Sequence, residues 1–482
     1  MTHEQGAGAL AATLSIFEAA REEPNRLALI AGGLELSFSA LATRVARRLA
    51  ELHAARALDP EGRRPVALVA HPRLATLETI LALFAAGTPL LALHARGTPA
   101  EHEALRLRAG AVLEPLGGPP GSAPLGAAPP LAAFDPERMA AIVATSGSTG
   151  APRLAQLSHR AFVAAAHAAA GHFGVEEDDR WLLSLPLAHI GGLCVLARSL
   201  VARRATVLFE PERPLLHDLE HFVSFAQASR VTLASLVPTI LGRLLAPPVA
   251  WRPSTSLRAV LLGGAAIPRS LVGRARAAGV PVMPTFGMTE ACAQAVTGRY
   301  SSRLTPVPPG PELFPSGVPL PGVEARIVGG LLELRGPTLF SGYLGNEASD
   351  PRGGWLKTLD RGHFDDAGEL VVTGRASDVI ITGGENVDPL ELEAALGSLP
   401  GVECAYVFGI PDETFGERIG ALLVVRPDGP RTVEAVTSRL AGRLASYKLP
   451  RHVELVADLP LTPAGKLDRH AARALHRLAH GS

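Results

Sequence analysis

The sequence is organised around Thr145-Ser146-Gly147-Ser148-Thr149-Gly150-Ala151-Pro152-Arg153, which follows the apolar run Met139–Ala144. The apolar run predicts a buried strand. The loop after it is rich in glycine and hydroxyl side chains and ends in a cation, so its N–H and O–H groups can surround a polyphosphate. It lacks the Gly-Lys-Ser/Thr ending of a Walker loop, and a flexible Ser/Gly turn between two strands is the alternative interpretation.

Three further blocks extend this pattern along the chain. They are Phe286-Gly287-Met288-Thr289-Glu290, Gly374-Arg375-Ala376-Ser377-Asp378 and Thr462-Pro463-Ala464-Gly465-Lys466. In order and approximate spacing, the four blocks resemble the adenylate-forming superfamily, which includes the acyl-CoA synthetases. The resemblance runs from about Leu14 to about Arg469, nearly the whole chain. Each block is a weak signal alone, but four in the same order are specific.

Composition limits the class of protein. A chain of 482 residues, 47% of them hydrophobic, is long enough for two or more domains. Basic and acidic residues number 46 each, so the net charge does not favour a nucleic-acid binder. The widely spaced Cys194, Cys292 and Cys404 indicate reduced thiols of a cytoplasmic protein, not a disulfide framework or a zinc site. We expect no signal peptide, because the N-terminus Met1–Gln5 lacks a basic region followed by an apolar core, and no membrane span, because no apolar stretch reaches about 18 residues.

Apolar periodicity predicts an α/β fold. Leu14–Leu52 indicates a helix, a hairpin and a second helix. The strand candidates Pro65–Ala70, Val231–Val237 and Ala259–Leu262 alternate with helices, as in βαβ units with a largely parallel sheet. Leu116–Pro130 is rich in Pro, Gly and Ala and predicts a loop or linker.

The C-terminal part has a different pattern. Ala325–Leu334 and Leu370–Thr373 predict strands of a smaller β region. From about Val379 the pattern is that of a compact α+β domain, with helix Leu390–Leu396, strands Ala405–Gly409 and Ala421–Val425, and helix Val433–Leu444. The resemblance implies a large N-terminal domain of residues 1–377 that binds acid and ATP. It also implies a small mobile C-terminal domain of residues 378–482, with its hinge at Asp378.

The chemistry of such a protein starts from an unreactive acid. An ionised carboxylic acid does not react with a thiol at neutral pH, because it has no good leaving group. Attack of the carboxylate on the α-phosphorus of ATP makes a mixed anhydride with AMP, and a thiol can then displace AMP. The protein must hold ATP, neutralise its phosphates, orient the acid and admit the thiol. The resemblance thus implies ATP, Mg²⁺ and coenzyme A as cofactors and co-substrates.

The resemblance also assigns the ATP and AMP contacts. The hydroxyl and N–H groups of Thr145, Ser146, Gly147, Ser148, Thr149 and Gly150 would hold the β- and γ-phosphates. Arg153 and Leu154 stand where the family usually has Lys and Gly, but Arg153 keeps the charge. The remaining nucleotide contacts implied are Gly263, Gly264 and Ala265 after a strand, the motif Thr285, Phe286, Gly287, Met288 and Thr289, and the pair Asp360 and Arg375.

Individual roles follow for the central motif. Phe286 would stack on adenine, and Thr289 would reach the α-phosphate. Glu290 would hold Mg²⁺, with Thr149 as a second contact to the metal. Taken without its motif, Glu290 would more simply be a solvated loop carboxylate.

Asp360 and Arg375 are the implied ribose contacts. The Asp360 carboxylate would accept hydrogen bonds from both ribose hydroxyls, and Arg375 would contact ribose and phosphate. Leu359 stands where the family has Gly, which weakens the match. Without the motif, either residue would be a member of a surface ion pair.

The C-terminal domain would act in two poses. In the first, Lys466 neutralises charge on the carboxylate and α-phosphate during adenylation. After rotation about Asp378, the segment with Gly383, Gly384 and Glu385 would lie beside the incoming coenzyme A, where glycines allow close backbone approach. A lone lysine near a C-terminus is otherwise usually solvated.

His189 and Arg198 are the candidate contacts to the acid substrate. His189 lies between apolar and glycine residues at a predicted loop-to-helix junction and would line the acyl pocket with Gly264 and Gly287; the alternative is a core histidine. Arg198 lies in an otherwise apolar helix start, where burial of an unpaired cation costs free energy. The alternative is a side chain that extends to the surface. The o-succinylbenzoate–CoA ligases of menaquinone synthesis have a basic residue at this offset, which implies binding of the substrate's second carboxylate.

The sequence therefore predicts an ATP-dependent acid–thiol ligase most similar to the o-succinylbenzoate–CoA ligases. Its implied catalytic residues are Lys466, Thr149, Glu290 and His189. The alternatives are another aryl- or fatty-acyl-CoA ligase, an enzyme that loads a carrier protein, or a non-catalytic nucleotide- or acyl-binding protein. The sequence leaves open whether the chain forms a homo-oligomer.

Overall fold

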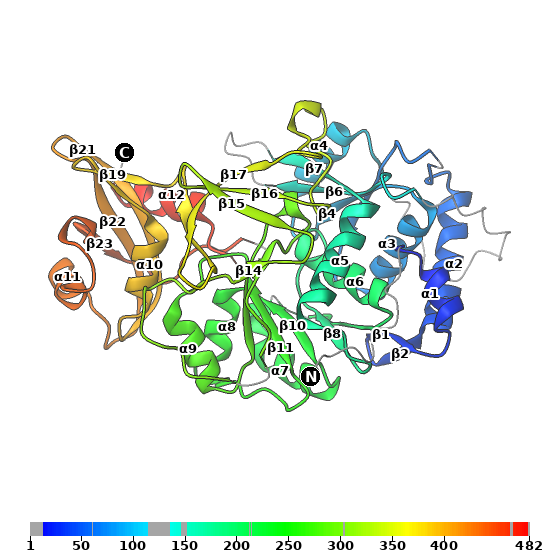
Figure 1. The fold of residues 1–482 in the computed structure, drawn as a ribbon, viewed down its shortest axis with the longest axis horizontal. Helices are drawn as coiled ribbons and strands as arrows, with labels where there is room; N and C mark the ends of the chain where they lie inside the picture. Colours follow the sequence, from blue (N-terminus) through cyan, green and yellow to red (C-terminus); the bar gives the residue numbers. More distant parts are fainter. Residues whose placement is uncertain are drawn as a thin grey trace.

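The structure is a computed structural model that describes residues 13–59, 61–113, 135–145, 152–211, 213, 215–301, 304–462 and 466–480. The predicted linker Leu116–Pro130 lies outside these residues. Figure 1 shows a large part built from the N-terminal and central segments, with the C-terminal segment forming a smaller part at one end.

The N-terminal segment forms the predicted helix, hairpin and helix. These are α1 (Ile16–Glu22), β1 (Leu27–Ala31), β2 (Leu34–Ser37) and α2 (Phe38–Ala54). The Ser37 hydroxyl accepts a hydrogen bond from the Ala40 N–H and so caps α2. The apolar residues spaced three or four apart along α2 are all buried: Leu41, Val45, Leu49 and Leu52.

A large sheet carries most of the central segment. Its further strands are β8 (Arg180–Leu183), β9 (Ala205–Leu208), β10 (Leu233–Leu236), β11 (Ala259–Gly263), β12 (Val282–Phe286), β13 (Val296–Thr297) and β14 (Val318–Pro319). Within the described residues the order is β14-β13-β12-β11-β10-β8-β9-β1-β2. Neighbours from β12 to β1 are parallel, as predicted, whereas β2, β13 and β14 pair antiparallel.

A second sheet contains the strand before the hydroxyl-rich loop. Its strands are β3 (Val66–Ala70), β4 (Leu90–His94), β5 (Val112–Leu113), β6 (Met139–Thr145) and β7 (Arg153–Ser158), in the order β5-β3-β4-β6-β7. The pairs are parallel except β6 with β7, which are antiparallel. The loop is therefore the connection of a β-hairpin.

Three helices contribute to one apolar core with both sheets: α3 (Leu74–Ala86), α5 (His159–Phe173) and α6 (Ile190–Ala202). Figure 1 shows α5 and α6 between β4 and β6 on one side and β8 and β10 on the other. One apolar core joins Leu90, Phe162, Leu193 and Leu233, so both sheets and both helices share it. Because α6 is apolar on nearly every face, burial fixes its position and so places His189 at its N-terminus.

Other helices pack on the outer faces of the sheets: α4 (Pro99–Ala109), α7 (Leu219–Ala228), α8 (Pro238–Leu244) and α9 (Arg269–Ala277). Short 3₁₀ turns are η1 (Leu215–His217), η2 (Thr289–Ala291) and η3 (Glu347–Ser349). Phe222, Leu241 and Leu271 of α7 to α9 form a second core with the large sheet. The prediction of a strand to Val237 is wrong at its end, because Val237 is the N-cap residue of α8 and Pro238 starts that helix.

The predicted smaller β region is an antiparallel sheet. Its strands, in spatial order, are β15 (Glu324–Val328), β16 (Leu331–Arg335), β17 (Leu356–Phe364) and β18 (Leu370–Arg375). The segment predicted as Ala325–Leu334 is a hairpin, because Gly329 and Gly330 both have positive φ and reverse the chain.

The C-terminal segment has its own sheet and core. Its elements are β19 (Ile380–Thr382), β20 (Glu385–Val387), α10 (Pro389–Gly397), β21 (Val402–Asp412), β22 (Gly416–Val425), α11 (Val433–Leu440), η4 (Ser446–Lys448), β23 (His452–Leu455) and α12 (Arg469–His480). Leu392, Val407 and Ala421 belong to this separate core. The prediction of a helix to Leu444 is wrong, because Ala441 leaves the helical conformation with a ψ of 133° and Gly442 has a φ of 78°.

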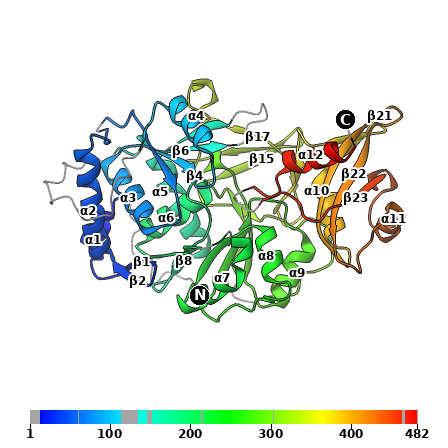
Figure 2. The same ribbon diagram turned by 180° about the vertical axis from the view of Figure 1, so that it is seen from behind.

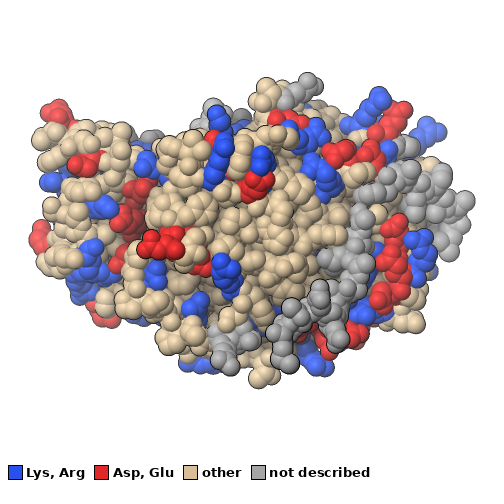
Figure 3. All heavy atoms as spheres, in the orientation of Figure 1, with Lys and Arg blue, Asp and Glu red and all other residues tan. Residues whose placement is uncertain are grey.

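No helix among the described residues is long and apolar enough to cross a membrane. On the face shown in Figure 3, basic and acidic side chains are interspersed over the surface. This distribution agrees with the balanced charge of the sequence.

Candidate active site

The ends of several parallel strands carry the predicted nucleotide residues. Strand β6 ends at Thr145, β11 at Gly263 and β12 at Phe286, and ligands of open α/β sheets usually lie at such carboxyl ends. Thr145 pairs with Arg153 across the hairpin, and its hydroxyl donates to the Arg153 carbonyl at 3.4 Å. Ser146, Gly147, Ser148, Thr149 and Gly150 lie outside the described residues, but both ends of their loop are fixed.

The base of this loop faces Glu290. The Arg153 Nη2 lies 3.9 Å from Glu290 Oε1, and the Arg153 guanidinium lies 4.3 Å from the centre of the Tyr343 ring. The Tyr343 hydroxyl donates a hydrogen bond to Glu290 Oε1. Burial and the neighbouring Glu290 carboxylate raise the pKa of Tyr343 well above its usual value. Glu290 is 5% exposed, so it is not the solvated loop carboxylate of the alternative interpretation.

Tyr343 is a site residue that sequence reasoning missed. Backbone bonds hold it: the Gln156 N–H donates to the Gly342 carbonyl at 3.0 Å, and the Leu344 N–H donates to the Leu154 carbonyl at 2.8 Å. The Tyr343 ring also explains why Arg153 replaces the lysine usual in the family, because a planar guanidinium stacks on an aromatic face better than an ammonium does.

Asp360 and Arg375 are brought together by strand register. They are paired residues of β17 and β18, and Arg375 Nε donates to Asp360 Oδ1 at 3.3 Å. Asp360 is 6% exposed. Burial raises its pKa although Arg375 opposes the shift, and the nearby Glu290 and Asp378 carboxylates add to it. The two residues form an ion pair, as the alternative interpretation stated, with Asp360 buried beside Glu290 and the Arg375 side chain about half exposed.

Lys466 lies against Gly264. A Cβ built on Gly264 would lie 2.7 Å from Cε and 3.0 Å from Nζ of Lys466. Gly264 has a φ of +83°, a second reason for glycine here. The Lys466 carbonyl accepts a hydrogen bond from the Thr462 N–H at 2.6 Å; residues 463–465 lie outside the described residues. Burial, and secondly Arg375, lowers the pKa of Lys466.

Two other glycines in the predicted site serve chain packing. A Cβ on Gly263 would lie 2.5 Å from the Thr285 carbonyl oxygen, and one on Gly287 would lie 1.4 Å from that of Ala293. Thr285 itself donates to the Val296 carbonyl at 2.9 Å. These glycines therefore allow the strands and the turn after β12 to approach each other.

His189 is the N-cap residue of α6, so the predicted loop-to-helix junction is confirmed. Its ring centre lies 5.3 Å from that of His94, which ends β4 and which the sequence did not single out. Burial lowers the pKa of His189 to about 4, with smaller contributions from His94 and Lys466. The Nε2 atoms of both histidines are buried and lack a hydrogen-bond partner among the described residues.

Arg198 is 5% exposed and does not extend to the surface. It lies in the C-terminal half of α6 rather than at the helix start, so that prediction is wrong. Its Nε and Nη2 have no hydrogen-bond partner among the described residues, and its guanidinium lies 5.5 Å from the Trp181 ring centre. Burial lowers its pKa. One turn earlier, Cys194 Sγ donates to the Cys292 carbonyl at 3.3 Å, which joins α6 to the turn after Glu290.

The predicted coenzyme A residues do not join this cluster. Gly383 and Gly384 form the tight turn between β19 and β20, with φ of 60° and 83°. The Gly383 N–H donates to the Phe415 carbonyl at 2.8 Å, and the Ile381 N–H donates to Glu417 at 2.8 Å, so the contacts described for this hairpin stay within the C-terminal sheet. Asp378, the predicted hinge, lies 4.0 Å from Arg469 Nε.

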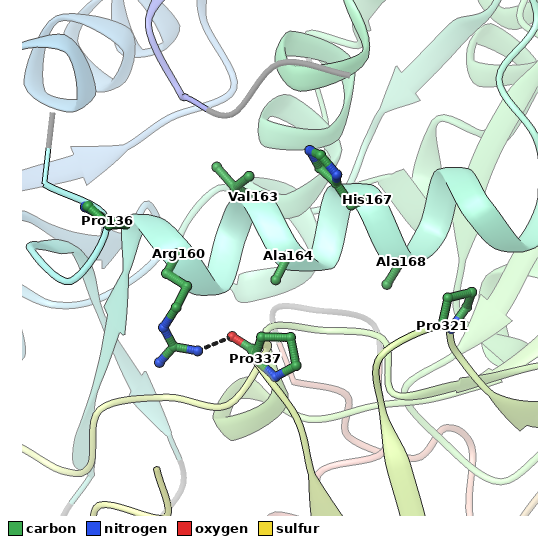
Figure 4. A pocket seen from close by; sticks show the side chains of 8 residues that line it. All are labelled: Pro136, Arg160, Val163, Ala164, His167, Ala168, Pro321 and Pro337. Atoms are coloured by element: carbon green, nitrogen blue, oxygen red, sulfur yellow. Dashed lines mark hydrogen bonds between the residues drawn. The ribbon is translucent and has the colours of Figure 1, made fainter. Parts of the chain in front are cut away.

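A hollow of about 430 Å³ lies elsewhere, between α5 and the loops around Pro321 and Pro337 (Figure 4). Arg160 donates to the Pro337 carbonyl at 2.5 Å at its edge. Its lining includes none of the predicted site residues, so we do not assign it to the active site.

Comparison with known families gives two matches. Residues 108–344 match the family described as AMP-binding enzyme, and residues 391–466 match the AMP-binding enzyme C-terminal domain. The chain is 39% identical over 340 residues to the 2-succinylbenzoate–CoA ligase of Bacillus licheniformis, covering 69% of each chain. It is 37% identical over 341 residues to a probable 2-succinylbenzoate–CoA ligase of Mycobacterium tuberculosis, covering 69% of this chain and 83% of that one.

Solved structures share the fold across most of the chain. The o-succinylbenzoate CoA synthetase of Bacillus subtilis in complex with its acyl-adenylate intermediate gives a TM-score of 0.80 at 28% identity, covering 94% of this chain and 96% of that one. The ATP-bound MatB of Rhodopseudomonas palustris also gives 0.80, at 26% identity, with 96% and 99% covered. The predicted fold class is thereby confirmed.

Proposed function

The chain belongs to the AMP-binding enzyme family. We propose that it is an AMP-forming acid–CoA ligase whose acid substrate is o-succinylbenzoate, and that this reaction is a step of menaquinone biosynthesis. The observation that carries the choice of acid is Arg198, a buried guanidinium with two nitrogens lacking a partner among the described residues. The relatives named for 2-succinylbenzoate ligation support the same choice.

The reasoning from Arg198 is one of desolvation. Removing a guanidinium from water costs several kcal/mol unless an opposite charge or hydrogen-bond acceptors replace the water. An acid with two carboxylates can supply that charge with the carboxylate that is not activated. Benzoate or a fatty acid has no such group, so the site would favour a dicarboxylic aromatic acid.

In the first half-reaction the acid's carboxylate would attack the α-phosphorus of ATP. Lys466, lying over Gly264, would balance charge between the two reacting groups. The loop 145–150, Arg153 and Thr289 would hold the phosphates, Phe286 the adenine, and Asp360 and Arg375 the ribose. His189 would be a neutral hydrogen-bonding group in the acyl pocket, because its pKa is about 4.

Glu290 fits a magnesium ligand. It is an oxygen donor with a charge, it is 5% exposed, and it lies beside the base of the loop. Mg²⁺ typically takes one or two carboxylates together with phosphate oxygens and water. Glu290, with Thr149, would hold the ion, and the ion would neutralise charge on the phosphates.

The second half-reaction would require the C-terminal segment to rotate. We propose residues 1–377 and 378–482 as the two domains, with Asp378 at the hinge. The separate apolar core of the C-terminal segment supports this division. Rotation would exchange Lys466 for the turn of Gly383, Gly384 and Glu385, which would lie beside coenzyme A while its thiol displaces AMP.

We further propose a cytoplasmic location. Cys194 and Cys292 are free thiols whose sulfurs lie 3.6 Å apart, and such a close pair persists as thiols in a reducing compartment.

Pyrophosphate exchange tests the proposal. ATP and labelled pyrophosphate are incubated with the chain and either o-succinylbenzoate, benzoate or a fatty acid. We expect exchange with o-succinylbenzoate to exceed that with the other acids by at least tenfold. Equal exchange with benzoate would contradict the choice of acid. Absence of exchange with every acid would contradict the proposal that the chain is a ligase. Thioester formation after adding coenzyme A then separates a CoA ligase from a carrier-protein-loading enzyme.

A further inference from the structure

Three side chains outside the proposed active site converge on one point of the C-terminal segment. His452 and Glu454 lie two residues apart on β23 and so project from the same face of the strand. His476 lies on α12, which Figure 2 shows alongside β22 and β23. One ligand atom from each of the three lies within 4.8 Å of the others.

The distances suit a shared ion. Glu454 Oε2 lies 3.1 Å from His476 Nδ1 and 3.9 Å from His452 Nε2. Ligand atoms that bind one tetrahedral zinc ion at about 2.0–2.1 Å lie roughly 3.3 Å from each other. These two separations bracket this value, and all three ligand atoms lie within 4.8 Å of one another, so side-chain adjustment would bring them to one ion.

The chemistry of the three groups also suits a metal. Two imidazoles and one carboxylate are donors that zinc and neighbouring transition metals bind well, whereas Mg²⁺ and Ca²⁺ prefer oxygen ligands alone. The His452, Glu454 and His476 side chains are 25%, 21% and 14% exposed, so solvent can reach them. The His476 ring packs at 4.9 Å from the Phe408 ring and 5.2 Å from the His452 ring, which limits its orientation.

We propose that His452, Glu454 and His476 form a binding site for one divalent transition-metal ion of the zinc class, with the remaining coordination position open to water. The ligands come from the two elements that flank the segment 456–468, which contains Lys466. An ion at this site would tie β23 to α12 and so restrain both ends of the lysine-bearing segment.

The test uses the full chain without an affinity tag, freed of metal by a chelator. Co²⁺ is titrated while visible absorption is recorded, and Zn²⁺ affinity is then measured by competition with a chromophoric chelator. We expect one equivalent of Co²⁺ to produce ligand-field bands that Zn²⁺ abolishes. Absence of these bands, or a stoichiometry unrelated to the chain, would overturn the proposal.

Variants assign the ligands. His476→Ala and Glu454→Gln should each weaken Zn²⁺ binding about tenfold or more, because loss of even an outer partner of a metal ligand typically costs 10–100-fold. Glu454→Gln keeps the size of the side chain and covers the case in which His476→Ala fails to fold. The matched control is His470→Ala on the same helix, since His470 is exposed and outside the cluster. Equal weakening by the control would show binding elsewhere and would refute the site.

Thermal unfolding provides a second measurement. A ligand that binds only the folded chain raises its melting temperature. Zn²⁺ should raise it for the unaltered chain and for His470→Ala, but not for Glu454→Gln. An equal rise in all three would mean that the ion acts at another place and would count against the proposal.

Discussion

The two sides of the proposed site differ in how their polar groups are satisfied. The nucleotide side, which consists of Arg153, Glu290, Tyr343, Asp360 and Arg375, has a charged or hydrogen-bonding partner for each member. The acid side, to which we assign His94, His189 and Arg198, has buried nitrogens without a partner among the described residues. The nucleotide side thus pairs its own charged groups, whereas the buried nitrogens of the acid side lack hydrogen-bond partners among the described residues.

This difference has a physical consequence for specificity. Groups that are already paired can exchange one partner for a phosphate or ribose at little cost, and the nucleotide is the same for every acid. Groups that are buried and unpaired gain most from the ligand that completes them, and they penalise an analogue that does not. We therefore expect substitutions on the acid side to change substrate choice and those on the nucleotide side to change overall rate.

The largest effect is expected for Lys466, which lies between the two sides. Lys466→Ala should lower acyl-adenylate formation by about 10²–10³-fold, because a single preorganised electrostatic contact to developing charge has this value. Attack of coenzyme A on a supplied acyl-adenylate should remain nearly unchanged. Rapid-quench assays of each half-reaction measure both. An equal loss of rate in both half-reactions would contradict the proposal that Lys466 acts only in acyl-adenylate formation.

Acid stability tests whether the acid side holds a neutral imidazole. His189 has a pKa of about 4 in the folded chain and about 6.5 when unfolded. The unfolded chain therefore binds more protons between these values, and stability is lost as the pH falls from about 6.5 to about 4. The contribution is about 3 kcal/mol, since one pKa unit corresponds to about 1.36 kcal/mol.

Urea unfolding of His189→Gln between pH 4 and pH 7 measures this contribution. The variant should lose less stability on acidification than the unaltered chain, with the remainder due partly to His159, whose pKa burial also lowers to about 4. His53→Gln on the exposed face of α2 is the control. An unchanged pH dependence in His189→Gln would show that the imidazole is not buried in neutral form.

Arg198 tests the acid side for substrate choice. Arg198→Met should weaken the use of o-succinylbenzoate by about 1.5–3 kcal/mol, the value of a hydrogen bond to a charged group, and leave the use of benzoate nearly unchanged. Exchange assays over a range of each acid give the two values of kcat/KM. Equal losses for both acids would remove Arg198 as the carboxylate contact.

The same variant should stabilise the ligand-free chain. Replacing a buried cation that lacks a partner by an apolar side chain of similar length should raise the free energy of unfolding by about 1–2 kcal/mol. Arg258→Met is the matched comparison, because Arg258 is a largely buried arginine that is paired with Asp179 at 2.5 Å. It should destabilise the chain by about 3–5 kcal/mol. Destabilisation by Arg198→Met as well would mean that Arg198 already has its partner.

Sequence reasoning predicted most residues of both sides and missed one on each. Glu290, Asp360, Arg375 and Lys466 were identified because they belong to blocks whose order along the chain is itself a signal. His94 and Tyr343 were missed because each stands alone at the end of a strand or in a loop, and only sheet packing brings it to the site. The strands were predicted well by apolar runs, but the end of α11 was not, because the turn at Ala441 and Gly442 depends on local backbone geometry.

Tyr343 supplies the smallest expected effect and tests the nucleotide side. Tyr343→Phe removes the hydroxyl that donates to Glu290, while Arg153 remains 3.9 Å from the same carboxylate. Because one partner remains, the loss of stability should be only about 1 kcal/mol. The freed oxygen should let exchange reach half its maximum at a lower Mg²⁺ concentration, with o-succinylbenzoate and benzoate affected alike. Tyr447→Phe, at a residue 38% exposed, is the control. A change that depends on the acid would place Tyr343 on the acid side and would remove the distinction between paired and unpaired groups.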